Sequence, residues 1–326
     1  MIRTKDIAEM VGVSRQAVTS VLNNTRPGCV SKEKREAIIK IASQYNYRPN
    51  HAARSLKTGK SNIIGVVMPP WNNPYVADLC MAIQKALAEK CYTPFFTIDN
   101  NFNPVPGNLE QLLALNVAGI ITVASSLLPD NIDTPVVSYF HDDPRFDSVC
   151  TNAELKTHMI CEYLKKNGHQ KIGYLGLKND SSAKLLNKVT SQYNLEFHER
   201  WNVNCVYSSN QDAFSQLLEQ NQNQDLPTAL IVHNDALAIK VMRSIYEHNY
   251  QIPKDFSIIG QDNLSYAQNA IPSLTSTSFG TPEEIANTMV ELLISRIKDK
   301  SSPRKKIVLN PQLFERESVL NLTPKF

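Results

Sequence analysis

The stretch that decides the fold is IAEMVGVSRQAVTSVLN, residues 7–23. Its apolar residues recur at helical spacing in two stripes, which are Ile7, Ala8 and Val11, and then Val18, Val21 and Leu22. Between the stripes lies Gly12-Val13-Ser14, in which the glycine permits a tight left-handed turn and the serine can cap the second helix. The small side chain of Ala8 lets the two helices cross closely. The pattern predicts a helix-turn-helix motif, whose second helix characteristically enters the major groove of DNA.

Charge is distributed unevenly along the chain. Residues 1–60 contain 12 Lys or Arg and 4 Asp or Glu, a net charge of +8, whereas the remainder contains 22 and 27, a net charge of −5. A basic head on a mildly acidic body is the electrostatic footprint of a module that binds phosphates. A basic face that is merely solvated is the alternative, and the helix pattern in the same residues favours DNA.

Length and composition exclude several classes of protein. A chain of 326 residues exceeds what one hydrophobic core organises, so two or three domains are expected. We find no secretory signal pattern and no apolar run approaching the ~18 residues of a membrane span, and we therefore expect a cytoplasmic protein. The six cysteines form no CxxC pair and have no histidine at metal-ligand spacing, which indicates free thiols and predicts neither a metal site nor a cofactor.

After residue 61 the chain alternates short β-branched runs with helical stretches. Nearly continuous apolar strands imply parallel sheets covered by helices on both faces, and two sets of them predict two doubly wound α/β lobes. The predicted strands are residues 63–68, 94–98, 119–123 and 135–139, followed by 171–175, 204–207, 229–232 and 257–260.

The order of these motifs resembles the lactose-repressor (LacI/GalR) family of bacterial transcription regulators. Its amino-terminal signature is matched by Asp6-Ile7-Ala8, Gly12-Val13-Ser14, residues 18–23 and Tyr47-Arg48-Pro49-Asn50, and its hinge by residues 52–57. Further matches in the body are Asn73-Pro74-Tyr75, Gly168-His169, Asn234-Asp235, Gly260-Gln261-Asp262-Asn263, residues 272–276 and Arg316-Glu317-Ser318.

The resemblance implies a domain organisation. An all-α helix-turn-helix headpiece would occupy residues 1–49, a hinge helix and linker residues 50–60, and a two-lobed effector-binding and dimerisation domain residues 61–326. The lobes would have the doubly wound fold of periplasmic sugar-binding proteins. The first would take about residues 61–151 and 279–312, and the second about residues 152–278.

The second helix of the motif is expected to read DNA. Arg15, Gln16 and Ser20 are predicted on its exposed face, where Arg15 offers a fork suited to guanine and Gln16 a donor–acceptor pair suited to adenine. A contact of Arg15 with phosphate alone is the alternative. The full set of predicted DNA-contacting residues is Thr4, Ser14, Arg15, Gln16, Thr19, Ser20, Asn23, Ala53, Leu56 and Lys57.

The hinge is too short to form a stable helix alone in water. The resemblance implies that two hinges fold together on DNA and that Leu56 enters the minor groove as a wedge, with Ala53 and Lys57 beside it. A core position in the headpiece is the alternative for Leu56. Two hinges require a homodimer, which would read a near-palindromic operator in double-stranded DNA.

A small-molecule effector is expected between the lobes, and a sugar-like molecule is one candidate. Predicted lining residues are Asn73, Tyr75, Phe140, Asp235 and Asp262, all at or just beyond strand ends. Alternatively, Asn73-Pro74 starts a helix and Asp235 caps one. Leu186 falls where sugar-binding relatives carry an arginine, so the usual binding of a common hexose is not expected, and the sequence leaves open whether a ligand exists.

No motif supports catalysis, so no catalytic residues are predicted. We therefore interpret the chain as a transcription regulator, with repression favoured. The alternatives are an activator, a regulator controlled by a protein partner, and a periplasmic-type binding protein without a DNA function.

Overall fold

The computed structural model describes residues 2–22, 30–47, 61–69, 73–98, 108–123, 125–177, 181–205, 212–222 and 225–323. The chain divides into two compact units, Met1–Ser61 and Asn62–Phe326. Within the described part, no helix combines the length and the apolar character that a membrane span requires.

The described residues of the first unit form three helices, α1 (Thr4–Val11), α2 (Arg15–Leu22) and α3 (Lys32–Gln44). Gly12 ends α1 in the left-handed conformation, with φ 67° and ψ 47°, which glycine adopts at little cost. Ser14 then caps α2, since its Oγ accepts a hydrogen bond from the N–H of Ala17 at 3.1 Å. The predicted helix-turn-helix is therefore confirmed, including the cap.

A small apolar core holds these helices together. The buried residues are Ile7, Ala8, Val18, Val21, Ile38 and Ala42. Ala8 is 4% exposed at the contact between helices, as expected for the small residue there. Tyr45 follows α3 as its cap and is 50% exposed, whereas Tyr47 packs against this core.

The second unit contains two six-stranded sheets. The first has the order β11-β5-β4-β3-β1-β2, and every neighbouring pair is parallel. Its elements are β1 (Ile63–Met68), α5 (Pro74–Glu89), β2 (Thr93–Ile98), α6 (Asn108–Ala114), β3 (Gly119–Thr122), η1 (Ser125–Leu127), β4 (Val136–Phe140), β5 (Asp147–Thr151), α12 (Pro282–Lys298) and β11 (Lys306–Leu309).

The second sheet has the order β12-β10-β9-β8-β6-β7 and is parallel except for β12, which runs antiparallel to β10. Its elements are α7 (Ala153–Lys166), β6 (Ile172–Leu177), α8 (Ser181–Val189), η2 (Thr190–Tyr193), η3 (Glu199–Trp201), β7 (Asn202–Cys205), α9 (Ala213–Gln220), β8 (Ala229–Val232), α10 (Asp235–Glu247), β9 (Ser257–Gln261), α11 (Ser265–Gln268), β10 (Thr275–Ser278) and β12 (Gln312–Phe314).

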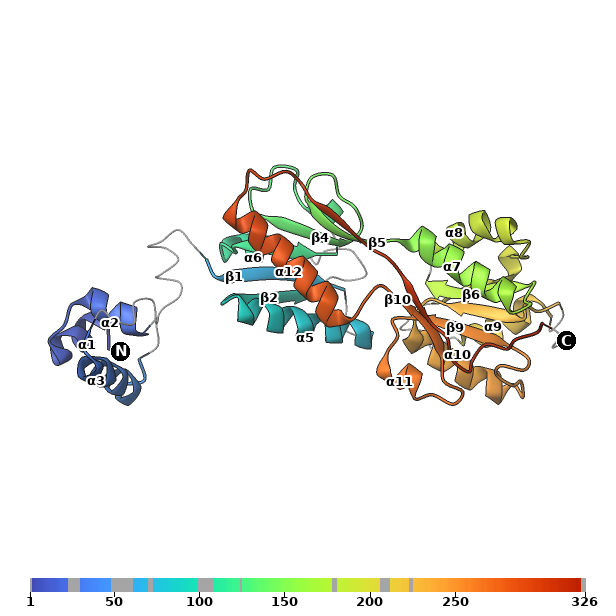
Figure 1. The fold of residues 1–326 in the computed structure, drawn as a ribbon, viewed down its shortest axis with the longest axis horizontal. Coiled ribbons are helices and arrows are strands. Elements are labelled where there is room, and N and C mark those ends of the chain that lie inside the picture. The colour runs from blue at the N-terminus through green and yellow to red at the C-terminus, as the bar shows by residue number, and fades with distance from the viewer. Residues whose placement is uncertain are drawn as a thin grey trace. The chain divides into compact units, whose positions relative to one another are not determined.

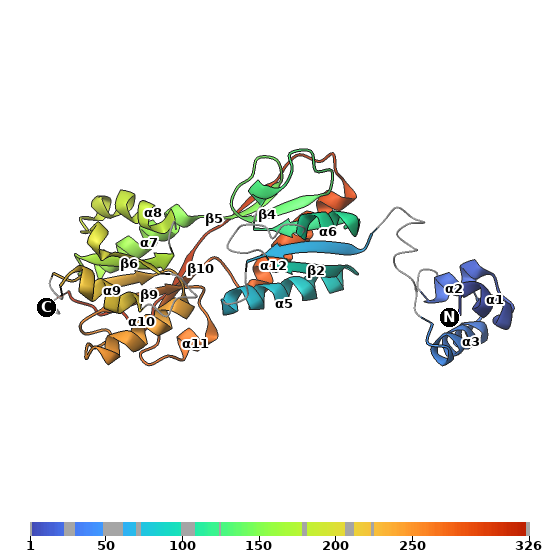
Figure 2. The same cartoon turned by 180° about the vertical axis from the view of Figure 1, so that it is seen from behind.

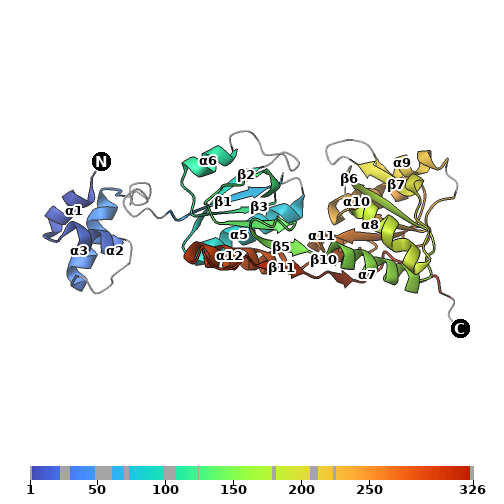
Figure 3. The same cartoon turned by 90° about the horizontal axis from the view of Figure 1, so that it is seen from above.

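The chain passes between the two lobes three times. β5 leads into α7, β10 leads into α12, and β11 leads into β12 (Figure 1). Seen from above, β5, β10 and β11 lie together where the lobes meet (Figure 3). The predicted two-lobed α/β fold is confirmed, and four strands that the hydropathy pattern had not indicated, β5, β10, β11 and β12, lie at or beside these crossings.

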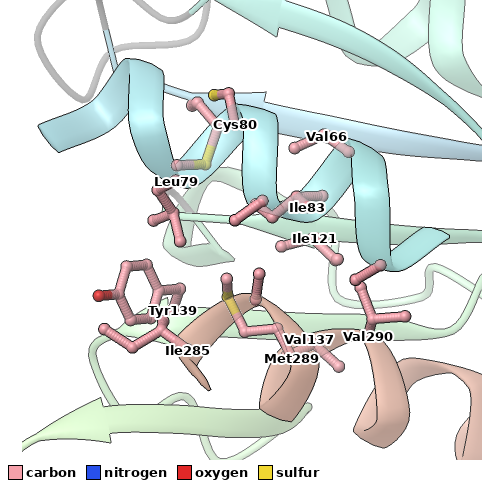
Figure 4. Packing of buried hydrophobic residues seen from close by; sticks show 14 of the residues in the cluster. Val66, Leu79, Cys80, Ile83, Ile121, Val137, Tyr139, Ile285, Met289 and Val290 are labelled. Atoms are coloured by element: carbon pink, nitrogen blue, oxygen red, sulfur yellow. The ribbon is translucent and has the colours of Figure 1, made fainter. Parts of the chain in front are cut away.

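Alternating side chains of each sheet supply two cores. Ile64, Val66 and Met68 of β1 pack under α5 and α12. Figure 4 shows a close view of this core. Val67, on the other face of the sheet, packs with Leu112 of α6. Figure 2 shows α6 on the face of the sheet away from α12. In the second lobe, one face packs against α7 and α8 and the other against α9 and α10. Both sheets are thus covered on two faces, as parallel sheets require.

A buried ion pair attaches α12 to the first sheet. Arg296 donates two hydrogen bonds of 2.8 Å to the Asp147 carboxylate at the start of β5, and the N–H of Lys305 donates a third of 2.7 Å. The side chain of Asp147 is 2% exposed and that of Arg296 is 14% exposed. Removal of one partner would leave the other charge buried and uncompensated.

We therefore expect Asp147→Ala to lower the free energy of unfolding of the second unit by about 3–5 kcal/mol. Asp133→Ala is the matched control, since it removes the ion pair between Lys300 and Asp133, whose side chains are 56% and 96% exposed. The control is expected to change stability little. Denaturant unfolding of both variants tests this, and equal effects would contradict it.

Candidate functional site: the exposed face of α2 and the contact between the lobes

The exposed face of α2, together with its cap, carries four of the six predicted DNA-contacting side chains that the structure describes. Arg15, Gln16 and Thr19 are exposed, as is the capping Ser14. The Thr19 hydroxyl donates to the carbonyl of Arg15 at 2.9 Å, so its free capacity is that of an acceptor. An arginine, an amide and a hydroxyl thus lie within one turn and a half of helix.

Ser20 does not belong to this exposed face. It is only 9% exposed, so its predicted exposed position is wrong. Successive helix residues are about 100° apart, so Ser20 lies about 100° from Val21 and about 160° from Val18, and the periodicity of α2 alone did not indicate its burial.

The start of α1 also differs slightly from the prediction. The cap residue is Arg3, one position before Thr4, and the Asp6 carboxylate accepts the N–H of Arg3 at 2.8 Å. Thr4 is the first helical residue and is half-buried. Four predicted DNA contacts, Asn23, Ala53, Leu56 and Lys57, lie outside the described residues.

In the second unit, two of the predicted effector residues meet across the lobes. The Asn73 Nδ2 of the first lobe donates to the Asp262 Oδ2 of the second at 3.3 Å. The Asn73 Oδ1 also accepts the N–H of Tyr75 at 3.1 Å, which caps α5, so the helix-start alternative holds together with the cross-lobe contact. Asp262 follows β9 in a turn where it and Asn263 have φ of 104° and 53°.

Two aromatic side chains lie behind this contact. Tyr75 is 7% exposed within the first core, and its hydroxyl lies 2.8 Å from that of Tyr139. Tyr75 therefore does not offer its ring to a ligand for stacking, which corrects the sequence interpretation. Phe140 is half-buried, with its ring centroid 4.0 Å from that of Tyr139.

Both predictions for Asp235, as a lining residue and as a helix cap, are wrong. It is fully buried, and Asn234 caps α10 by accepting the N–H of Leu237 at 2.9 Å. The Asp235 carboxylate instead accepts the N–H of Leu264 at 2.8 Å and the hydroxyl of Ser276 at 2.7 Å. It supports the turn that carries Asp262.

The two carboxyl groups are protonated more readily than usual. Burial and the nearby Asp235 charge together raise the pKa of Asp262 to about 8, against the hydrogen bond from Asn73. Burial also raises the pKa of Asp235 to about 6. The cross-lobe contact therefore involves a carboxyl that is largely protonated near neutral pH.

A hollow at the carboxyl edge of the second sheet adds residues that sequence reasoning missed. It is lined by side chains of α7, α8 and the strand ends, among them Lys156, Tyr174, Ser182, Leu186, His233 and Gln261. Lys156 donates to the Gln261 side chain beside Asp262. The sequence did contain a signal for Lys156. This residue lies one turn into α7, the helix that Asn152 caps. Leu186 gives the hollow an apolar side chain.

Comparison with known proteins identifies both units. Residues 4–50 match the family model for bacterial regulatory proteins of the lacI family, and residues 161–319 match that of the periplasmic binding protein-like domain. Residues 4–50 therefore form a domain of the lacI family, and the chain as a whole is similar to regulators of that family. It is a DNA-binding transcription regulator with the fold predicted from its sequence.

Relatives of the same family match along nearly the whole chain. The HTH-type transcriptional repressor PurR of Mannheimia succiniciproducens is 29% identical over 334 residues, with 98% of this chain and 99% of the relative covered. PurR of Photobacterium profundum is 28% identical, with 99% and 100% covered. The Lac repressor bound to ONPG in the repressed state has the same fold, with a TM-score of 0.83, 23% identity, and 98% and 99% covered.

The raised pKa of Asp262 predicts a pH-dependent stability. Because the folded-state value of about 8 exceeds the ordinary 3.8, this carboxyl contributes stability that is fully present below about pH 4 and is lost as the pH rises to about 8. Asn at position 262 does not titrate. We therefore expect the wild type to lose stability relative to Asp262→Asn between about pH 5 and pH 8 in denaturant unfolding.

Asp212→Asn is the control for this comparison. Hydrogen bonds from serine hydroxyls and backbone N–H groups outweigh burial and hold the pKa of Asp212 below its usual value, so its contribution changes only in more acidic solution. A difference between wild type and Asp262→Asn that stays constant with pH would contradict the prediction.

Proposed function

We propose that the chain is a dimeric repressor that binds an operator in double-stranded DNA, and that a small molecule bound between its lobes controls this binding. The observation that carries the proposal is the outward face of α2, with Arg15, Gln16 and Thr19 exposed on a capped helix in a unit of high positive charge. Both PurR relatives are named repressors. Such a protein works in the cytoplasm, where the DNA is, and needs no catalytic residue.

We assign base contacts to Arg15, Gln16 and Thr19, whose hydroxyl is free to accept a hydrogen bond, and backbone contacts to Ser14 and Thr4. An arginine fork reads guanine and a glutamine amide reads adenine in the major groove. Hydroxyl groups at a helix start suit phosphate, because the helix dipole and the free N–H groups already favour an anion there. Residues 50–60 are assigned to the hinge, with Leu56 as the minor-groove wedge and Ala53 and Lys57 beside it.

A dimer is supported by apolar side chains exposed along one side of the first lobe. Met81 on α5 is 70% exposed, and Phe95 and Ile98 on β2 are 38% and 43% exposed. β2 is an edge strand, and α5 contacts it. Exposed edge strands with large apolar residues are typical of sites that associate with another chain. A two-fold dimer would present two headpieces to a near-palindromic operator.

The effector is assigned to the space between the lobes, around Asp262, Asn73, Phe140 and the hollow beside them. A ligand that prefers one arrangement of the lobes shifts the fraction of dimers able to bind DNA. The apolar Leu186 and the Lys156–Gln261 pair in that hollow argue for an effector other than a common hexose bound through an arginine fork.

The first test substitutes the DNA-reading residues. Arg15→Ala removes a bidentate base contact and is expected to weaken operator binding about 10- to 100-fold, since such a pair contributes ~1–3 kcal/mol. Leu56→Ala is expected to weaken it as well, by loss of the wedge. The measurement is binding to duplexes from the protein's own promoter region, titrated against salt.

Arg243→Ala is the matched control, since it removes the same charge from an exposed side chain of α10. It is expected to leave operator affinity unchanged. Full affinity in both the Arg15 and the Leu56 variant would overturn the assignment of DNA contacts.

The dimer face is tested by charge insertion. Met81→Asp is expected to raise the dimer dissociation constant at least about tenfold, because an unpaired charge would be buried at the contact. Val308→Asp is the control, since Val308 is 46% exposed on β11, at the opposite edge of the same sheet. Sedimentation equilibrium measures both variants, and equal dissociation constants for the two would exclude this face.

A further inference from the structure

Four segments that are distant in sequence converge on one buried carboxylate. Asp235 at the start of α10 is fully buried and accepts hydrogen bonds from the Leu264 N–H after β9 and from the Ser276 hydroxyl in β10, at 2.8 and 2.7 Å. Arg316, just after β12, donates to the Asn263 side chain and to the carbonyl of Leu274. The segment that returns from the first lobe therefore contacts the same turn.

The turn between β9 and α11 needs such support. Asp262 and Asn263 both have positive φ, a conformation that costs side-chain-bearing residues free energy and persists only where neighbours impose it. Here the N–H of Asn263 donates to Ser276 Oγ at 3.1 Å, and the N–H of Asp262 donates to the carbonyl of Thr277 at 2.8 Å. Ser276 therefore joins the Asp235 carboxylate to the strained turn.

Space around Asp235 is fully used. A Cβ atom added to Gly260 would lie 2.2 Å from the Asp235 Oδ1, closer than any real contact, so β9 approaches the carboxylate only because residue 260 is glycine. Asp235 therefore lies behind the effector site, in contact with the backbone that carries Asp262, and is not in the hollow itself.

We propose that Asp235 is a positioning residue for effector control, which holds the turn of residues 262–264 so that Asp262 meets Asn73 of the other lobe. The inference rests on the proposed function of the space between the lobes. Asp235 also acts by charge, because its negative charge favours the protonated form of Asp262. It thus sets both the place and the protonation of the carboxyl at the cross-lobe contact.

The experiment uses the full chain without DNA or effector. Asp235→Ala and Ser276→Ala remove support from the turn, and amide hydrogen exchange of residues 262–264 is expected to accelerate at least about tenfold relative to β8. The matched control is Asp212→Asn, at a half-buried carboxylate that accepts the N–H of Phe214 at 3.0 Å and caps α9 in the same lobe. In the control, exchange of the turn is expected to stay unchanged.

A second readout separates positioning from general stability. Asp235→Asn keeps the shape of the side chain and removes its charge, so the pKa of Asp262 should fall. We then compare Asp235→Asn with the double variant Asp235→Asn/Asp262→Asn. The pH range over which their stabilities diverge should lie lower than the range over which wild type and Asp262→Asn diverge. Asp212→Asn should not move it. Asp235→Asn and Ser276→Ala also keep the test valid if Asp235→Ala does not fold.

Unchanged exchange of the turn in Ser276→Ala, or an unmoved pH range in Asp235→Asn, would overturn the proposal. Neither readout depends on DNA. Loss of the expected effect of Arg15→Ala on operator binding would therefore count against the proposed function, while leaving the role of Asp235 to be decided by exchange and pH.

Discussion

Parallel strand pairing is the constraint on which the arrangement of the second unit depends. Parallel strands cannot be joined by hairpins, so most are followed by a covering helix, with β4 and β5 as an exception, and the loops that leave the strands gather at one edge of each sheet. In this chain the carboxyl ends of β6, β8 and β9 bring Tyr174, His233 and Gln261 to one hollow. Three crossings between the lobes then attach that edge to the other lobe.

The motifs that carried the family resemblance have a common structural reason in the second lobe. Asn234 caps α10, Asp235 supports the turn, Gly260 makes room for its carboxylate, and Ser276 and Arg316 fasten the turn from two further segments. Motifs that are separated by up to about eighty residues in the sequence therefore describe one place in the fold. Their role is to present Asp262, which contacts Asn73 of the other lobe.

Strands made of apolar runs could be predicted from the sequence, and those made of polar residues could not. β10 reads Thr275-Ser276-Thr277-Ser278 and has no hydropathy signal, yet it is buried because its hydroxyls bond to Asp235, Gly260 and Arg316. β5 starts at Asp147, whose buried charge is compensated by Arg296, 149 residues later, and by the N–H of Lys305. Both strands depend on partners that are distant in sequence, which a local pattern does not contain.

The candidate site shows the same division. The positions of Asn73 and Asp262 followed from their places at strand ends, and the two side chains do meet. Asp235 and Tyr75 also follow strands, but their side chains turn into buried networks, at Ser276 and at Tyr139. Residue type and position at a strand end did not distinguish a side chain facing the other lobe from one facing the core. Ser20 of the headpiece illustrates the same limit on a helix.

The strength of the cross-lobe contact suits a switch. One hydrogen bond between an amide and a largely protonated carboxyl contributes about 1 kcal/mol net, which changes an equilibrium constant about fivefold. Allosteric coupling between sites is typically ~1–3 kcal/mol. A contact of this size biases the lobes towards one arrangement, yet a ligand that offers Asp262 and Asn73 better partners can outweigh it. A fully ionised, buried pair at the same place would resist such exchange, because separating it would leave two desolvated charges.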